Sequence, residues 1–456
     1  MKQLNRREFL KLGAILAGGA ALAACAPAAA PAPAAPAATA APAAAAPAAT
    51  AAPKAAAPAA GAAKKKLEIF SWWTSGGEIE ALNALLDPFK KKYPDVEVIN
   101  AAIAGGSSSG GDMKVVLQTR MMGGDPPESF QIHLGGELLD GSYVSADKME
   151  PLDFLYKEEG WDKVFPKQLI DIASKDGKPY SVPVNIHRSN MMWYNKKMFD
   201  DIGAKPPKTW DEFFVVAEKL KAKGLPAIAI SESAAGQAAH VFETVLIANM
   251  GPEKFAGLFN GTTKWDDPAV KTSLEMFKKI LGYANPDYLS VGWGDLNDLM
   301  INGKAAMMVM GDWTPGVLWS KGFKDFGWQA APGNEGIYQM LSDSFGLPKN
   351  VKNREAAINF LKMVGSKEGQ DGFNVPKGSI PARTDADMSK YTDYHKWAME
   401  EWKKDKIVPS IVHGAAASLA FMTDYMNAVN VFATKKDVDQ TAAAILKAAK
   451  DAGLQK

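Results

Sequence analysis

Four tryptophans stand at the ends of predicted elements rather than on the apolar faces of helices. Trp72 and Trp73 end the first predicted strand, Trp293 lies just before a helix, and Trp313 follows another strand. An indole at the mouth of a strand presents a flat apolar face to a ligand. A single tryptophan is more often part of a core, but the repeated position at strand ends favours a ligand-stacking role.

Polar side chains occur at equivalent places. A sugar ring combines a flat C–H face with a rim of hydroxyls, so a sugar site needs stacking groups together with planar polar groups. The polar groups at predicted strand and helix ends are Glu78, Gln131, His133, Asp312, Asp343, Lys377 and His413. Together with the tryptophans, they indicate a carbohydrate-binding site.

Other chemistries lack their motifs. The five histidines make no H-x-x-x-H or H-E-x-x-H spacing, and Cys25 is the only cysteine, so neither a metal site nor an intrachain disulfide is predicted. No G-x-S-x-G elbow, Walker loop or dinucleotide fingerprint is present. The sequence therefore predicts no metal, no cofactor and no catalytic residues.

Charge and composition exclude further classes. The formal net charge is +1, and the first 63 residues hold five basic residues and one acidic residue, which leaves −3 for the rest of the chain. A slightly acidic body argues against nucleic acid as a partner, because phosphate binding needs a basic face. With 23% charged residues the chain is no multi-spanning membrane protein. Its 456 residues predict two or three domains.

Residues 1–24 are predicted to be an export signal. Arg6 and Arg7 precede an apolar stretch over 12–24, which is too short to span a bilayer comfortably. The stretch ends in Leu-Ala-Ala before Cys25, which resembles the lipobox of bacterial lipoproteins and implies that Cys25 carries lipid. The twin arginine resembles a Tat signal. A Sec signal with a chance arginine pair is the alternative.

Residues 25–63 form a second N-terminal segment, composed almost wholly of alanine and proline after the cysteine. Frequent proline prevents a continuous helix and favours an extended chain. At about 3.1 Å per residue such a segment reaches on the order of 100 Å. It is predicted to be a tether between the membrane and a folded body.

The body alternates strands and helices. Strands are predicted over 67–72, 96–102 and 129–133, with helices over 78–92 and 113–122 between them. This β-α-β-α-β order predicts an α/β fold with a largely parallel sheet and helices on both faces. Ligand groups in such sheets lie beyond the carboxyl ends of the strands.

A second block of the same kind begins near residue 190. Thr209 to Glu212 form a capping box that opens a helix through 220. Further strands are predicted over 191–194, 227–231, 305–310 and 340–347, and further helices over 238–250, 270–281, 355–364, 388–404 and 437–451.

Several segments resemble the bacterial extracellular solute-binding proteins (family 1) that serve sugar ABC transporters. They are Phe70-Ser71-Trp72-Trp73-Thr74, Gly311-Asp312-Trp313 and the run from Ser342 to Pro348. Gln131-Ile132-His133 and the run from Pro409 to Gly414 are most similar to the glucose/mannose-binding branch. The resemblance covers residues 64–456.

The resemblance implies a periplasmic-binding-protein-like fold, in which two α/β lobes are joined by three hinge crossings and hold the ligand in the interlobe cleft. The chain would leave the first lobe near 184–188, return near Ser342 and cross again near Pro381. Lobe 1 would then comprise 64–186 plus 342–380, and lobe 2 would comprise 187–341 plus 381–456.

The resemblance also implies roles in the site. Trp72 and Trp73 would be stacking or wall residues, and Trp293 and Trp313 would close over the sugar from lobe 2. The implied polar ring consists of Glu78, Gln131, His133, Asp343, Lys377 and His413.

The expected function is capture of a monosaccharide of glucose, mannose or galactose type by hinge closure, without catalysis. The expected protein is a monomer, lipid-anchored outside the cytoplasm, that delivers sugar to the transmembrane permease subunits of an ABC transporter. Binding of an oligosaccharide is one alternative. A secreted glycosidase is another, because glycosidases also combine tryptophan platforms with paired carboxylates.

Overall fold

The computed structural model describes residues 65–74, 76–103, 111–234 and 236–455. The chain divides into one unit of residues 1–61 and another of residues 62–456, and all the elements below belong to the second. The predicted export signal, Cys25 and the predicted tether lie outside the described residues. In the described part of the chain, no helix combines the length and the apolar character needed to cross a membrane.

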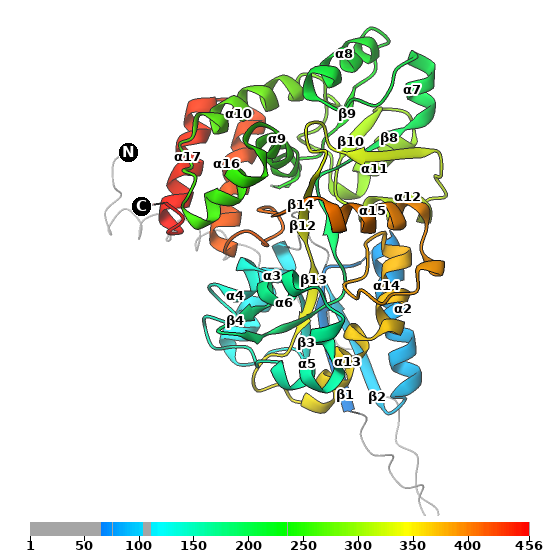
Figure 1. Ribbon diagram of the computed structural model, residues 1–456, viewed down its shortest axis with the longest axis vertical. Helices are drawn as coiled ribbons and strands as arrows, with labels where there is room; N and C mark the ends of the chain where they lie inside the picture. The colour runs from blue at the N-terminus through cyan, green and yellow to red at the C-terminus, as the bar shows by residue number, and fades with distance from the viewer. Residues whose placement is uncertain (1–64, 75, 104–110, 235, 456) are drawn as a thin grey trace, which may run out of the picture. The chain divides into compact units, whose positions relative to one another are not determined.

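The first sheet has the strand order β2-β1-β3-β13-β6. Its parallel part consists of β1 (Lys65–Ser71), β2 (Val96–Ala102) and β3 (Ser129–His133), and β13 (Asp343–Gly346) and β6 (Ser181–Pro183) are antiparallel to their neighbours. The helices α2 (Gly76–Lys92) and α3 (Gly111–Gly123) connect the parallel strands, as predicted. Figure 1 shows this body in the lower half of the molecule.

Two helices that return late in the chain complete the first body. They are α13 (Arg354–Gly365), which contacts β1, and α14 (Lys367–Lys377), which packs against α2. The sequence did not predict α14, because its two internal glycines and Pro376 disfavour a helix. Those glycines permit close packing: a Cβ at Gly372 would lie 3.2 Å from the carbonyl oxygen of Ala84 in α2. Tertiary contact therefore overrides the local preference here.

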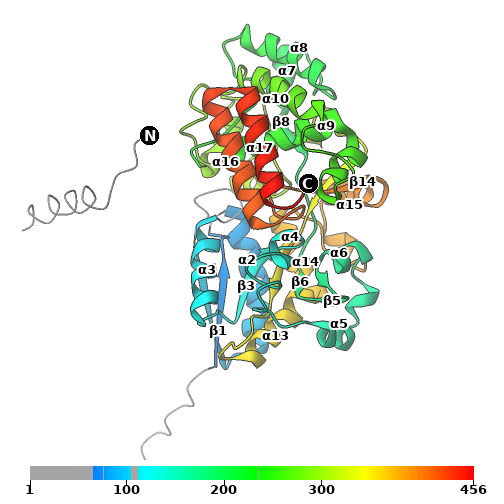
Figure 2. The ribbon, with the colours of Figure 1, turned by 90° about the vertical axis from the view of Figure 1, so that its left-hand side faces the viewer.

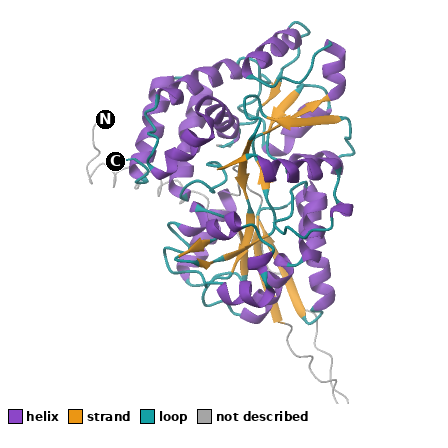
Figure 3. Ribbon diagram, viewed as in Figure 1, coloured by secondary structure: helices purple, strands orange, loops and turns teal. Residues whose placement is uncertain are grey.

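The second sheet has the order β11-β8-β10-β9. Its strands are β8 (Met191–Asn195), β9 (Ile228–Ala229), β10 (Met307–Val309) and β11 (Phe326–Ala330). The helices of this body are α7 (Lys196–Ile202), α8 (Trp210–Lys221), α9 (Gln237–Asn260), α10 (Pro268–Leu281), α11 (Trp293–Ile301), α12 (Thr314–Ser320), α16 (Leu419–Lys435) and α17 (Val438–Asp451). Figure 2 shows α16 and α17 side by side on this body, and Figure 3 shows its helices around the shorter strands.

Local signals explain several of these elements. The side chain of Thr209 accepts a hydrogen bond from the backbone of Glu212 and caps α8, as its sequence predicts. Strand β8 alternates between two apolar cores: Met191 and Trp193 belong to one, and Met192 belongs to the other. Successive side chains of a strand point to opposite faces, so a strand that contributes to a core on each side is buried on both faces. Helix α16, like α14, was not predicted from the sequence.

A third, narrow sheet joins the two bodies. Its order is β14-β12-β7, with β7 (His187–Arg188), β12 (Ile337–Leu341) and β14 (Lys406–Pro409). The strand predicted over 340–347 is wrong in one respect, because it is two strands that separate at Ser342 and enter different sheets. The chain passes between the sheets at this point. All residues from Ile337 to Gly346 are buried, so no change of burial marks the break.

Three passages of the chain run side by side between the bodies. Ile186 and Ile380 exchange backbone hydrogen bonds of 2.8 and 3.1 Å, and Leu341 pairs with His187. The helix α15 (Asp393–Lys404) lies in the same region (Figure 1). The remaining short elements are α4 (Gly136–Leu139), α5 (Asp153–Glu159), α6 (Lys167–Ile172), β4 (Ser174–Lys175), β5 (Lys178–Pro179) and the 3-10 turns Trp161–Lys163 and Met388–Lys390.

Candidate functional site

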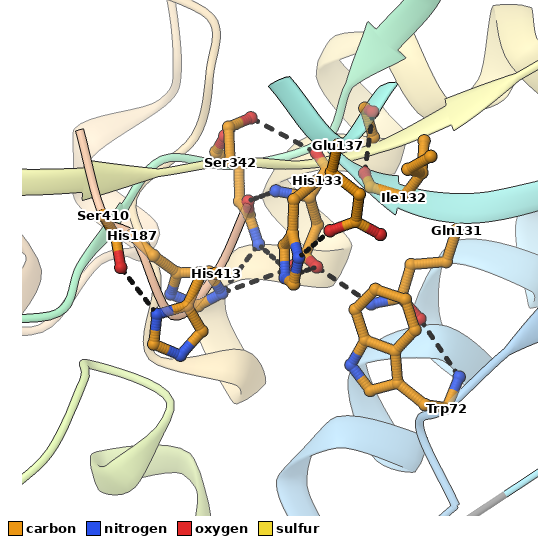
Figure 4. A network of polar contacts seen from close by, with 12 residues as sticks. Trp72, Gln131, Ile132, His133, Glu137, His187, Ser342, Ser410 and His413 are labelled. Carbon is orange, nitrogen blue, oxygen red and sulfur yellow. Dashed lines mark hydrogen bonds and ion pairs between the residues drawn. The ribbon is translucent and has the colours of Figure 1, made fainter. Parts of the chain in front are cut away.

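The carboxylate of Asp343 lies at the centre of a buried polar network. Asp343 begins β13 and is opposite His133, the last residue of β3. One carboxylate oxygen accepts a hydrogen bond of 2.8 Å from the side-chain amide of Gln131 and lies 3.6 Å from Nε2 of His133. The side-chain oxygen of Gln131 in turn accepts from the backbone of Trp72 at 3.2 Å. Four candidate ligand groups, Trp72, Gln131, His133 and Asp343, thus lie together, and Figure 4 labels the first three.

The second oxygen of Asp343 faces the first passage between the bodies. It accepts a hydrogen bond of 2.9 Å from Asn185 and lies 3.1 Å from Nε2 of His187. Burial alone would raise the pKa of Asp343, but the hydrogen bond and charge of His187, with His133 and Lys377 nearby, hold it well below its usual range. Asp343 is therefore an ionised acceptor in a buried position.

His187 links two carboxylates of different bodies. Its Nε2 faces Asp343, and its Nδ1 makes a short hydrogen bond with Asp312, which follows β10. Burial by itself would lower the pKa of His187, but the charge and hydrogen bond of Asp312 and the hydrogen bond with Asp343 raise it above its ordinary value. Asp312 also accepts from the backbone of Arg188 at 3.0 Å. These bonds fix the turn that carries Trp313.

His133 has an equally defined environment. Its Nδ1 lies 3.0 Å from the carboxylate of Glu137, which is fully buried and forms an ion pair of 2.8 Å with Lys114 on α3. Burial would raise the pKa of Glu137, yet Lys114 and His133 keep it below its ordinary value. The ammonium of Lys114 also lies 5.1 Å from the centre of the Trp72 ring. This set orients His133 and Trp72 toward the same region.

Three imidazole rings surround Trp313. The ring centres of His413, His187 and His240 lie 4.9, 5.3 and 5.9 Å from that of Trp313. Trp293 contacts the same indole at 6.4 Å. Trp313 and Trp293 are only partly buried, which leaves apolar ring surface available to a ligand.

Lys377, Glu78 and Trp73 form a separate group at the start of α2. The ammonium of Lys377 lies 2.5 Å from the carboxylate of Glu78 and 5.6 Å from the centre of the Trp73 ring. Trp73 is only 1% exposed, and its ring packs on Phe345 and Phe373. Of the ten candidates, Trp73 is thus the one most deeply engaged in core packing.

Close backbone contacts lie on one side of the cluster formed by the Asp343 network and the rings around Trp313. The backbone N–H of Glu137 donates to the carbonyl of Gly414 at 2.9 Å, which joins the start of α4 to the loop before α16. A Cβ at Gly136 would lie 2.5 Å from the carbonyl oxygen of Ala417. Only glycine permits this approach between the two bodies.

The second flank is built in the same way. A Cβ at Gly316 in α12 would lie 2.5 Å from the carbonyl oxygen of Pro376 and 2.6 Å from that of Lys377 in α14. A Cβ at Gly77 in α2 would lie 2.8 Å from the backbone of Gly316. The bodies therefore meet through bare backbone on both sides of the aromatic and polar cluster.

The structure thus brings nine predicted groups around two neighbouring centres. The first centre is the Asp343 network with its aromatic surroundings, which comprises Gln131, His133, Asp343, Trp72, Trp313 and His413. Trp293 joins this centre through its contact with Trp313. The second centre is the adjacent ion pair of Lys377 and Glu78. Sequence reasoning missed the supporting residues Lys114, Glu137, Asn185, His187, His240 and Glu243. No local signal marks them, since each acts through a partner distant in the chain or on another element.

Among the described residues, no group of three or more histidine, cysteine or acidic side chains is arranged to hold a metal ion.

Two α/β bodies, joined by adjacent chain passages and holding an aromatic and polar cluster between them, define a two-lobe ligand-binding protein. The model of the family described as bacterial extracellular solute-binding protein matches residues 73–371. An uncharacterized ABC transporter extracellular-binding protein of Pyrococcus horikoshii is 38% identical over 393 residues, which cover 85% of this chain and 88% of that protein. The chain belongs to the bacterial extracellular solute-binding protein family.

Two further comparisons agree with this assignment. A probable sugar-binding periplasmic protein of Mesorhizobium japonicum is 33% identical over 407 residues, which cover 85% of this chain and 94% of that protein. The solved structure of a chitin oligosaccharide binding protein has the same fold, with a TM-score of 0.74 at 22% identity, over 85% of this chain and 98% of that one. The two-lobe fold expected from the sequence is confirmed.

Proposed function

We propose that this protein binds one monosaccharide of glucose, mannose or galactose type between its lobes and delivers it to the permease subunits of an ABC transporter. The observation that carries the proposal is the Asp343 network bounded by Trp72 and Trp313. An ionised, buried carboxylate and a ring of amide and imidazole groups accompany partly exposed indole faces, as a hydroxylated ring requires.

The close flanks support one sugar ring rather than a chain. Backbone contacts at Gly136 and at Gly316 bound the cluster on two sides, and neither leaves room even for a methyl group. An oligosaccharide that extended toward either flank would meet backbone there. Oligosaccharide binding is the second candidate, and it is favoured by the likeness in fold to a chitin oligosaccharide binding protein.

The ligand-contact roles in this proposal belong to Trp72, Glu78, Gln131, His133, Trp293, Trp313, Asp343, Lys377 and His413, with Trp73 as a wall residue behind Lys377. The proposed lobes are 64–186 plus 342–380 and 187–341 plus 381–456, and they hinge at the three adjacent passages. Extended crossings of this kind permit rigid-body closure over a ligand.

The proposal includes no catalysis. The carboxylates that a glycosidase would need are engaged with partners: Glu78 with Lys377, and Asp343 with Gln131, Asn185 and His187. The proposed location is outside the cytoplasm, in keeping with the family. In this proposal the protein is a monomer that is exported by a Tat signal and anchored to the membrane through a lipid on Cys25.

Isothermal titration tests the function. The panel should contain glucose, mannose, galactose, xylose, maltose and chitobiose. We expect at least one monosaccharide to bind more tightly than the disaccharides, with one ligand per chain. If a disaccharide bound at least tenfold more tightly than every monosaccharide, oligosaccharide binding would replace monosaccharide binding as the proposed function. Release of reducing sugar from an aryl glycoside would contradict the absence of catalysis.

A further inference from the structure

Glu243 is a buried carboxylate beside the site. It lies on α9 and is 1% exposed. It accepts a short hydrogen bond from the backbone of Ile411, a bond of 3.4 Å from Val412 and a side-chain contact of 3.3 Å with Ser410. These three residues form the start of the loop that carries His413. Glu243 therefore holds that loop in place.

The hydroxyl of Ser410 stands between Glu243 and His413. Its Oγ lies 3.3 Å from Oε2 of Glu243 and 2.9 Å from Nδ1 of His413 (Figure 4 shows the second bond). A serine hydroxyl has a single proton to donate. If it donates to one neighbour, it can only accept from the other; if Glu243 is ionised, that donation goes to Glu243, and if Glu243 is protonated, the serine proton is left for Nδ1 of His413.

Two arrangements of protons satisfy this geometry. In the first, the protonated acid of Glu243 donates to Ser410, Ser410 donates to Nδ1 of His413, and Nε2 of His413 carries a proton. In the second, ionised Glu243 accepts from Ser410, Ser410 accepts from Nδ1–H, and Nε2 is a bare acceptor. The second arrangement holds one proton fewer, and that proton is released to water.

The surroundings make both arrangements accessible. The other side chains facing Glu243 are Gln339 from β12 and Tyr425 from α16. Burial, opposed by the backbone bonds of Ile411 and Val412, raises the pKa of Glu243 to about 8.

His413 itself stays neutral. Burial, together with His240 on α9, His133 on β3, Lys114 on α3 and His187 on β7, holds its pKa well below the ordinary value. A neutral ring is the form whose tautomer a neighbour can select.

We propose that Glu243 selects the tautomer of His413 through Ser410 and so decides whether His413 offers the sugar a donor or an acceptor. The inference rests on the proposed sugar-binding role of His413. Glu243 is in this view a positioning residue. With the acid protonated, Nε2–H donates to a sugar hydroxyl; with the acid ionised, Nε2 accepts a hydroxyl proton instead. A site that exchanges a donor for an acceptor changes which hydroxyl orientation it satisfies.

Nitrogen-15 NMR of the histidine rings in the ligand-free protein tests the relay directly. We expect wild-type His413 to carry its proton on Nε2 at pH 6.5 and on Nδ1 at pH 9. Glu243→Gln keeps an acceptor for Ile411 and a donor for Ser410, so it should hold the Nε2–H form over the whole range. Ser410→Ala should abolish the pH-dependent change.

Glu232→Gln is the matched control. Glu232 also has a pKa raised by burial and lies just before α9, but it bonds Ala238 and Asn430 rather than the His413 loop. It should leave the tautomer change of His413 intact. A wild-type tautomer that is the same at pH 6.5 and pH 9, or an unaltered change in Ser410→Ala, would overturn the relay.

Titration with glucose and mannose over the same pH range gives the functional readout. Replacing a donor by an acceptor at Nε2 of His413 changes one neutral hydrogen bond to the sugar, so the affinity of the wild type should change by roughly five- to tenfold between pH 6.5 and pH 9. The affinity of Glu243→Gln should not change over this range. Equal pH profiles for the two proteins would contradict the inference. A tautomer change in a protein that binds no sugar would support the relay and refute the proposed function, so the two failures are distinguishable.

Discussion

Substitution of Gly136 by alanine should hold the two lobes apart by steric overlap. Gly136 is the first residue of α4 and is not among the residues with a positive φ, so alanine fits its backbone. The added Cβ would nonetheless lie 2.5 Å from the carbonyl oxygen of Ala417, where ordinary contact begins at 3.4 Å. The opposing loop must therefore move by about 1 Å, and overpacking of this kind costs about 1–3 kcal/mol.

We expect this cost to fall on the arrangement in which the lobes touch at Gly136, and to be relieved when they separate. A ligand that needs closure then binds more weakly by the same free energy, which corresponds to about 5- to 140-fold in Kd. Isothermal titration with the preferred sugar measures the loss, and stopped-flow dissociation should show faster release. Gly316→Ala, on the opposite flank, should behave alike, because its Cβ would lie 2.5 Å from the carbonyl oxygen of Pro376.

Gly294→Ala is the control, since a Cβ at this helical position meets nothing within 4 Å. It should bind sugar as the wild type does. Thermal unfolding of the ligand-free proteins separates the two explanations of a loss. If Gly136→Ala bound sugar normally, or if it lowered the melting temperature of the ligand-free protein as much as that of the complex, the reasoning about closure would be refuted.

Four further predictions concern single residues. Trp313→Ala removes an indole face and should cost about 1–3 kcal/mol of binding, evenly across sugars of one ring size, as measured by titration. Asp343→Ala removes charge-assisted hydrogen bonds of roughly 1.5–3 kcal/mol each, so its loss should be larger for glucose than for the deoxy sugar that lacks the paired hydroxyl; wild-type binding of every sugar would remove Asp343 from the site. Folding raises the pKa of Glu243 from 4.5 to about 8, so the folded state binds more protons and the free energy of unfolding should fall as pH rises between these values; urea denaturation should show this fall in the wild type and a smaller one in Glu243→Gln. Cys25→Ser should abolish metabolic lipid labelling and release the protein from membranes, and continued labelling would contradict the lipoprotein prediction.

Elements with strong local signals were predictable. Strands β2 and β3 begin and end at the predicted residues. The Thr209 N-cap of α8 and the apolar spacing of α2 needed no tertiary information, because the capping hydrogen bond and the periodicity are local.

Elements decided by tertiary contact were not predictable. Helix α14 forms despite its glycines and a proline because those glycines allow close packing on α2. The break at Ser342 depends on where two sheets meet, and the residues on both sides of the break are buried. Neither feature leaves a periodic signal in the chain.

The amino-acid sequence by itself determined which side-chain types are available and that they follow strands. Gln131 lies within β3, His133 ends that strand and Asp343 begins β13, and the sequence placed all three on or beside predicted strands. The tertiary structure decided their partners. Asn185 and His187 reach Asp343 across more than 150 residues of chain, and Glu243 reaches Ser410 across 167. Hydrogen-bond partners, and therefore the charge of Asp343 and the tautomer of His413, depend on distances that only the packed lobes create.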